Sequence, residues 1–108
     1  MGIEATVEKD AREYIEARGG KSRKWVSPGH KGVPDRILSH PNTGPFAIEF
    51  KAPGKKLDAH QKNVCNELAR EGWRVYAPVA TIRAAREIID DEIAERPGAR
   101  HPYMDGLD

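Results

Sequence analysis

The chain has 108 residues and a net charge of +1, which allows one folded domain and leaves no room for a second core. No stretch approaches the roughly 18 apolar residues of a membrane span, and the first residues do not resemble a signal peptide, so we expect a cytoplasmic protein. The single cysteine, Cys65, excludes an internal disulfide and fits a reducing compartment. We predict one domain over residues 1–95 and a tail over residues 96–108, where no periodicity is visible.

Basic residues are concentrated in two parts of the chain. Five of them and no acidic residue lie between Ala17 and Pro34, and a second cluster follows at Lys51, Lys55, Lys56 and Lys62. Such a distribution suits contact with a phosphate backbone, although an ordinary mixed surface accounts for it equally well.

The first part of the chain predicts a helix and then a strand. Apolar residues at helical spacing (Val7, Ala11, Tyr14 and Ile15) indicate an amphipathic helix with Thr6 as its cap. Glu8 lies beside this apolar stripe, so it either points at a neighbouring strand or is a solvated carboxylate. The β-forming stretch Lys24–Ser27 is predicted to be the first strand, followed by a turn rich in glycine and proline.

Two short runs, Arg36–Ser39 and Phe46–Lys51, predict a β-hairpin because the residues between them are typical of turns. In the second run Ile48 and Phe50 share one face, while Glu49 and Lys51 share the other. The hairpin would fold Asp35, which precedes the first run, back toward Glu49.

The remaining chain predicts a helix, a strand and a helix. Asp58 and Gln61 have the spacing of a capping box at the start of a helix, and a strand over Trp73–Val79 follows. Thr81 is expected to cap a last helix. The order αβββαβα, with a crossover long enough for a βαβ unit, indicates an α/β fold with a mixed sheet and helices on both faces.

Asp35, Glu49 and Lys51 are the candidate catalytic residues. Two carboxylates and the backbone carbonyl of Phe50 offer hard oxygen ligands to Mg²⁺ or Mn²⁺, with positions left for water and a phosphate oxygen. Lys51 could hold the attacking water, act as a base or stabilise charge on the phosphate. The alternative is a surface Glu-Lys pair with an unrelated turn aspartate, because Glu-x-Lys alone is a weak motif.

Four motifs taken together are more specific: GVPDRI at residues 32–37, IEFKAPGKKL at 48–57, Gln61, and EGWRV at 71–75. With the first helix, they make the chain from about Glu4 to Ile89 resemble the VRR-NUC family of the PD-(D/E)xK nuclease superfamily. The resemblance implies a restriction-endonuclease-like fold and metal-dependent cleavage of DNA. It also implies that a glutamate of the first helix joins the metal site, which we assign to Glu8 with Glu4 as the alternative. Gln61 is implied to lie near the site, and a role only in the capping box is equally open.

Stand-alone members of this type resemble enzymes of bacteria and viruses that act on four-way junctions as homodimers. The resemblance therefore implies a Holliday-junction resolvase in a bacterial or phage-infected cell. The same chemistry directed at flaps or nicks is a second possibility, and a DNA-binding module that has lost catalysis is a third. His30, Lys31, Lys55 and Lys56 are the residues expected to contact the DNA backbone.

Overall fold

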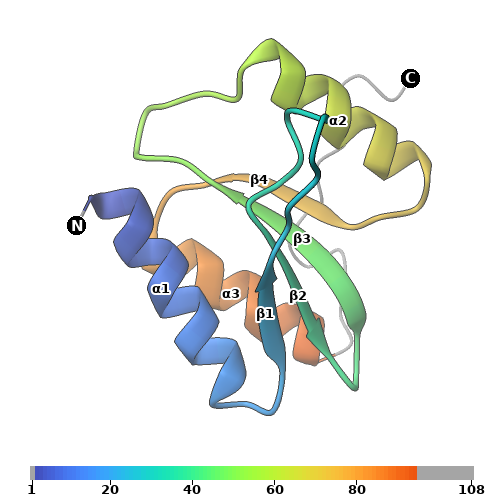
Figure 1. Ribbon diagram of the computed structural model, residues 1–108. Helices are drawn as coiled ribbons and strands as arrows, with labels where there is room; N and C mark the ends of the chain where they lie inside the picture. The colour runs from blue at the N-terminus through green and yellow to red at the C-terminus, as the bar shows by residue number, and fades with distance from the viewer. Residues whose placement is uncertain (1, 95–108) are drawn as a thin grey trace.

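The computed structural model describes residues 2–94, which form a sheet flanked by helices (Figure 1). The predicted tail over residues 96–108 lies outside the described residues. The elements are α1 (Ile3–Glu16), β1 (Lys21–Lys24), β2 (Arg36–His40), β3 (Gly44–Phe50), α2 (Ala59–Arg70), β4 (Val75–Val79) and α3 (Ile82–Ile93). This order confirms the predicted αβββαβα arrangement. Within the described residues, no helix has the length and apolar character needed to cross a membrane.

The sheet has the strand order β1-β2-β3-β4. The pairs β1–β2 and β2–β3 are antiparallel, whereas β3 and β4 run parallel and are joined through α2. The sheet is therefore mixed, and β4 is an edge strand, as the proline near its end predicts.

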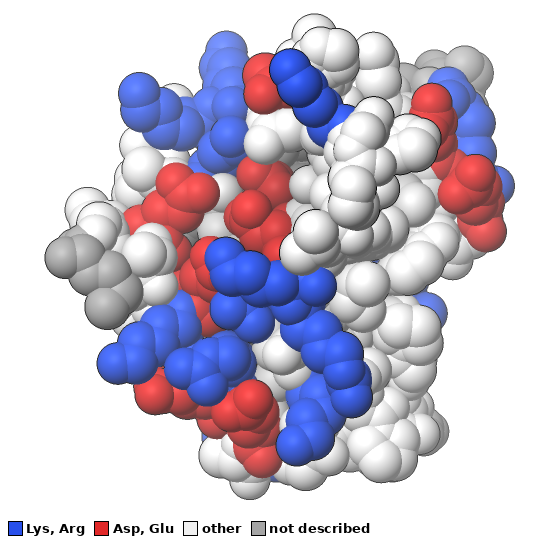
Figure 2. Space-filling view, in the orientation of Figure 1, with Lys and Arg blue, Asp and Glu red and all other residues white. Residues whose placement is uncertain are grey.

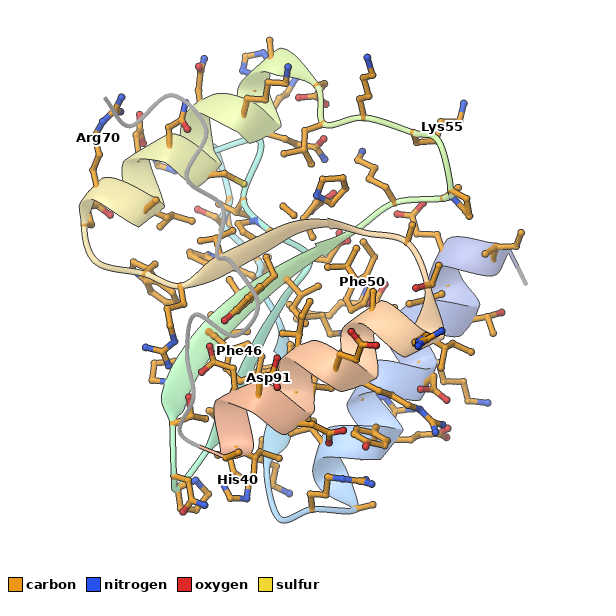
Figure 3. All side chains as sticks on the ribbon, turned by 180° about the vertical axis from the view of Figure 1, so that it is seen from behind. His40, Phe46, Phe50, Lys55, Arg70 and Asp91 are labelled. Atoms are coloured by element: carbon orange, nitrogen blue, oxygen red, sulfur yellow. The ribbon has the colours of Figure 1, made fainter. Side chains whose placement is uncertain are left out.

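Helices cover both faces of the sheet, so the side chains that alternate along β3 enter two separate hydrophobic cores. Phe46, Ile48 and Phe50 are fully buried on the face that packs against α1 and α3, which Figure 3 shows from behind. Ala47 lies on the opposite face, in a second core with Cys65 and other residues of α2 and β4. Glu49 follows Ala47 at the two-residue period of a strand, so it also belongs to the α2 side.

Strands β3 and β4 differ from their predicted ranges at their ends, and two other predicted boundaries are further off. The first strand was expected at Lys24–Ser27, but β1 is Lys21–Lys24, because this edge strand is built from charged and polar residues that pair with β2 while the apolar residues follow it. Helix α1 begins at Ile3 with Gly2 as its N-cap, and the Thr6 hydroxyl donates to the Gly2 carbonyl from inside the first turn.

The loop between β1 and β2 reaches across to α2, and Gly32 makes this approach possible. Gly32 has φ +89°, and a Cβ there would lie 2.7 Å from the carbonyl oxygen of His60. Any other residue would combine backbone strain with a clash at this contact. The loop then enters β2 through the buried Pro34, and this path sets the position of Asp35.

A buried polar network ties α3 to the sheet and was not predicted. Glu92 is 0 % exposed and accepts hydrogen bonds from Arg74, Tyr76 and Thr43. Burial acts to raise the pKa of Glu92, but these hydrogen bonds and the Arg74 charge outweigh it and hold the pKa below its usual range.

Candidate active site

Asp35 and Glu49 lie opposite each other at the end of the β2–β3 ladder. The last paired residues are Arg36 and Ile48, and extending this register by one residue places Asp35 across from Glu49. On the other side of β3, the register with β4 shifts between Ile48 and Phe50, so β4 has an extra residue beside Glu49. Bulges of this kind commonly occur next to active sites, where they redirect a strand end.

Glu49 is a buried carboxylate with incomplete hydrogen bonding. It is 3 % exposed, and its Oε1 atom has no hydrogen-bond partner among the described residues. Burial, followed by the charge of Asp35, raises the pKa of Glu49 to about 8, against a weaker opposing effect of Lys51. The Asp35 backbone N–H also opposes the rise, but it makes no hydrogen bond of normal geometry with Oε1. A buried acid with one open oxygen is costly for the fold unless a cation or a proton compensates it.

Asp35 is partly buried and is fixed by the backbone of β3. Its Oδ2 accepts a hydrogen bond of 2.8 Å from the Phe50 N–H. Burial raises the pKa of Asp35, and the charges of Glu8 and Glu4 add to the rise against the Phe50 hydrogen bond. The charge of Asp35 in turn raises the pKa of Glu49, and a cation beside the two carboxylates would favour their ionised forms.

Lys51 and Gln61 both contact Glu49 through its Oε2 atom. Lys51 Nζ lies 3.8 Å from this oxygen, and the lysine side chain is 21 % exposed. Gln61 Nε2 donates to the same oxygen at 2.8 Å. The Gln61 Oε1 atom meanwhile accepts from the Asp58 N–H, and Asp58 caps the Gln61 N–H in return. Gln61 thus belongs to the capping box and to the site at once.

The two glutamates of α1 have different surroundings. Glu8 is 18 % exposed and pairs with Arg36 Nε at 2.7 Å, with Lys24 at 3.9 Å. Glu4 is half-buried in the first turn of α1, and its charge raises the pKa of both Asp35 and Glu49. Of the two positions left open for Glu8, the one that points at a neighbouring strand is observed, and its carboxylate is compensated by Arg36.

The four predicted DNA contacts are exposed on two loops beside the site. His30 and Lys31 are on the β1–β2 loop, and Lys55 and Lys56 are on the loop between β3 and α2. Figure 3 shows Lys55 extending from this loop into solvent. In Figure 2, acidic side chains gather in a hollow, with basic side chains above and below them. This charge pattern could hold a cation in the hollow and a phosphate backbone across it.

The donor set fits a divalent cation of the Mg²⁺ type. Among residues 2–94, no three His, Cys, Asp or Glu side chains are gathered closely enough to hold an ion by themselves. Mg²⁺ usually takes one or two carboxylates and keeps several waters, so Asp35 and Glu49 suffice. The partnerless Oε1 of Glu49 is the atom that such an ion would satisfy.

The fold and these residues define a class. A mixed sheet that sets an aspartate opposite a Glu-x-Lys strand end, within the order αβββαβα, is the arrangement of the PD-(D/E)xK superfamily. The family model of the VRR-NUC domain matches residues 3–80, and the chain belongs to this family.

Known proteins resemble the chain over most of this region. "Putative nuclease p44" of Acyrthosiphon pisum secondary endosymbiont phage 1 is 41% identical over 58 residues, which are 54% of this chain and 62% of that protein. A solved structure described as "VRR_NUC domain" superposes with a TM-score of 0.76 at 28% identity, covering 83% of this chain and 97% of the other. A second solved structure, described as "VRR_NUC domain protein", has a TM-score of 0.71 at 18% identity. The match covers 86% of this chain and 89% of the other, and it shows a shared fold.

Sequence reasoning missed Arg36 as the partner of Glu8 and the Glu92 network. Arg36 directly follows Asp35, so the alternation of a strand already places the two side chains on opposite faces, with Arg36 on the face away from Asp35. Nothing in the spacing of Arg74, Tyr76 and Glu92 indicates their convergence, because β4 and α3 meet only in the folded chain.

Proposed function

We propose that the chain is a divalent-metal-dependent endonuclease that hydrolyses phosphodiester bonds in branched DNA, with Holliday junctions as substrates and a homodimer as the active form. The observation that carries the proposal is the buried Oε1 of Glu49, which has no hydrogen-bond partner in the described chain and lies beside a second carboxylate. Membership of the VRR-NUC family supports a nuclease, and the printed name of the phage relative agrees with it.

Asp35, Glu49 and the Phe50 carbonyl would hold Mg²⁺ or Mn²⁺. In an extended strand the N–H and C=O of one residue point to the same side. The Phe50 N–H donates to Asp35, so its carbonyl is expected on the Asp35 side of β3 as well. Glu4 and Glu8 are the candidates for an assisting carboxylate from α1. The ion pair with Arg36 favours Glu4, because Glu8 would have to exchange a close cationic partner for the metal.

The chemistry that a bound ion supplies at such a site is neutralisation of phosphate charge and activation of a water. Gln61 and Lys51 contact Oε2 of Glu49, which leaves Oε1, without a hydrogen-bond partner among the described residues, available to such an ion. The Lys51 ammonium, partly exposed beside Glu49, would stabilise charge on the scissile phosphate. Exposed Lys31, Lys55 and Lys56 would bind flanking phosphates.

Cleavage of immobile four-way junctions, flaps and linear duplex with Mn²⁺ and with a chelator tests the proposal. We expect Mn²⁺-dependent cleavage that favours junctions, and a dimer in a measurement of mass in solution. Glu49→Ala and Lys51→Ala should each lose cleavage while keeping the fold and DNA binding. A preference for flaps would replace the junction assignment, and an active Glu49→Ala, Lys51→Ala double variant would end the nuclease assignment.

A further inference from the structure

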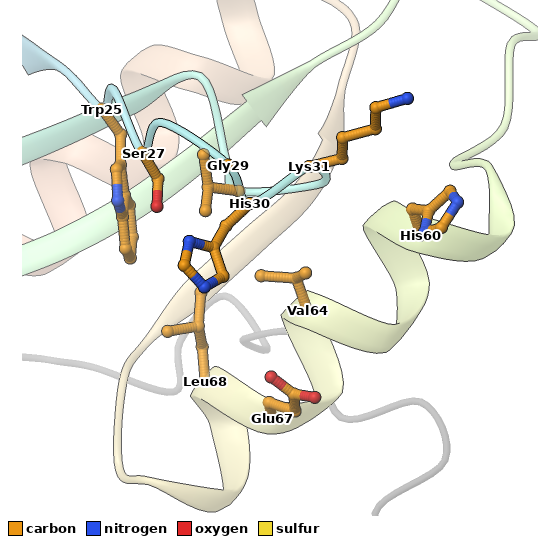
Figure 4. Close-up of a pocket in the computed structure, with 10 residues that line it drawn as sticks. Trp25, Ser27, Gly29, His30, Lys31, His60, Val64, Glu67 and Leu68 are labelled. Atoms are coloured by element: carbon orange, nitrogen blue, oxygen red, sulfur yellow. The ribbon is translucent and has the colours of Figure 1, made fainter.

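A groove of about 680 Å³ lies between the β1–β2 loop and α2 (Figure 4). This volume is within the roughly 300–1,000 Å³ of ordinary ligand pockets. The groove is separate from the carboxylate pair, and neither Asp35 nor Glu49 lines it. The proposed metal site therefore lies outside the groove, whereas Lys31, proposed to bind a flanking phosphate, lines it.

Both walls of the groove lead to the candidate active site. The loop wall continues through Val33 into Asp35, which is two residues further along the chain. The helix wall contains His60, which directly precedes Gln61 and its hydrogen bond to Glu49. The groove and the candidate active site thus share the β1–β2 loop and the start of α2, so one DNA strand could occupy both.

The lining changes in character along the groove. Lys31 and His60 are at the end near the start of α2, and Figure 4 shows Lys31 projecting there. Further along α2 the lining is mainly apolar and aromatic, with Val64, Leu68 and the indole of Trp25 beside the imidazole of His30. A cationic end followed by an apolar and aromatic section matches the order of phosphate and base in a nucleotide.

Trp25 is held in a fixed position as part of this lining. Its ring packs against Trp73 with centroids 5.0 Å apart and an interplanar angle of 33°. The Trp25 backbone N–H donates to the backbone carbonyl oxygen of Asp35 at 3.1 Å, which joins this residue to the start of the active-site strand. A rigid aromatic side chain binds a flat partner at a low entropic cost.

Glu67 lines the groove near this apolar section. It is exposed, and its carboxylate has no hydrogen-bond or ion-pair partner within residues 2–94. A carboxylate accepts hydrogen bonds and donates none, so it favours bases that present an exocyclic amino group. Cytosine and adenine offer such a group on the edge that an unpaired base exposes, as guanine also does, whereas thymine presents a single imide N–H between two carbonyl oxygens there.

We propose that the groove is a subsite for one unpaired nucleotide next to the scissile phosphate, with Glu67 selecting cytosine or adenine over thymine. The base lies against Trp25, Val64 and Leu68, and its phosphate is bound by Lys31 and His60. This subsite rests on the proposed nuclease function, because the neighbouring phosphate is the one that Asp35 and Glu49 serve. Its substrate is a nucleotide that is frayed or flipped out at a branch point.

Binding of short oligo-dC, oligo-dA and oligo-dT to the wild-type chain in a chelator tests the subsite without cleavage. Fluorescence anisotropy should show that oligo-dC and oligo-dA bind roughly tenfold more tightly than oligo-dT, the size expected of one base-edge contact. Glu67→Gln should reduce this difference to less than about threefold, since an amide can serve thymine as well. Glu71→Gln, an exposed residue near the end of α2 and outside the groove, should keep the full preference.

Equal binding of the three oligonucleotides by the wild-type chain would overturn the subsite, and so would an undiminished preference in Glu67→Gln. The nuclease proposal fails separately, through absence of Mn²⁺-dependent cleavage by the wild-type chain. The two failures are distinguishable because the binding experiment contains no metal.

Discussion

Gln61 Nε2 donates a 2.8 Å hydrogen bond to Oε2 of Glu49, and the same side-chain amide closes the capping box of α2. Gln61 alone therefore connects the start of α2 to the end of β3. The Asp58 backbone N–H donates to the amide oxygen of Gln61, so the NH₂ group of Gln61 faces Glu49 and its oxygen faces the start of the helix. This arrangement predicts that stability and activity can be separated by two substitutions.

Asp58→Ala should lower the free energy of unfolding by about 1 kcal/mol, because the cap is lost, and leave DNA cleavage near the wild-type level. Gln61→Ala should cost a similar free energy and also lower cleavage by roughly 10–100-fold, as removal of a group that orients a ligand does. Denaturant unfolding and single-turnover cleavage of both variants measure the two effects. Equal cleavage by Asp58→Ala and Gln61→Ala would show that Gln61 acts through the helix alone.

The raised pKa of Glu49 predicts that the metal-free chain becomes less stable with rising pH. The folded pKa of about 8 exceeds the ordinary value of 4.5, so the stabilising effect of the protonated form is complete below 4.5 and is lost as pH rises to about 8. Unfolding in a chelator should show a decrease on the order of 1–4 kcal/mol between about pH 5 and pH 8.5.

Glu49→Gln is the matched control for this pH dependence, because the amide has the same shape and does not titrate. Its unfolding free energy should vary much less over the same range. Saturating Mn²⁺ should abolish the decrease in the wild-type chain, since a cation stabilises the ionised pair. A flat wild-type profile in a chelator would contradict the shifted pKa.

Glu92→Ala should destabilise the fold without changing the site. Removing the buried Glu92 leaves the Tyr76 hydroxyl and the partly exposed Arg74 without their acceptor, which costs about 1–3 kcal/mol. The network lies at the β2–β3 turn, where Thr43 donates to Glu92, and not at the Asp35 end of these strands. Thermal unfolding should report the loss, while cleavage per folded molecule stays within about twofold of wild type. A large loss of cleavage by the folded variant would place Glu92 in the catalytic machinery.

The lysines of the β3–α2 loop should contribute to the salt dependence of DNA binding. Lys55→Ala should reduce the slope of log K against log salt by about 0.9, and the Lys55→Ala, Lys56→Ala pair by about twice this amount. Lys21 pairs with Ser39, at the end of the sheet away from Asp35, so Lys21→Ala should leave the slope unchanged. A reduced slope in Lys21→Ala alone would move the DNA to the other end of the sheet.

Much of this architecture follows from local patterns in the sequence. The alternation of Ile48, Glu49 and Phe50 predicts their faces, and the spacing of Asp58 and Gln61 predicts the capping box; both are confirmed. The turn between β2 and β3 sets the hairpin register, which is why the juxtaposition of Asp35 and Glu49 could be predicted.

Other features depend on contacts that local patterns do not record. The position of β1 was wrong because an edge strand needs little apolar character, and the apolar Trp25 just after it lies against Trp73 instead. The pairing of Glu8 with Arg36 depends on the distance between α1 and β2, which no spacing in the chain encodes. The roles of Asp35, Glu49, Lys51 and the α1 glutamates as metal-site residues stay predictions.

The central claim is that Asp35 and Glu49 together bind one divalent cation on which DNA cleavage depends. Calorimetric titration of Mn²⁺ into the wild-type chain, Asp35→Asn, Glu49→Gln and Glu71→Gln tests it directly. We expect the wild-type chain and Glu71→Gln to bind Mn²⁺, and Asp35→Asn and Glu49→Gln to lose both Mn²⁺ binding and Mn²⁺-dependent cleavage. Unchanged Mn²⁺ binding by Glu49→Gln, or cleavage by the wild-type chain in a chelator, would contradict it.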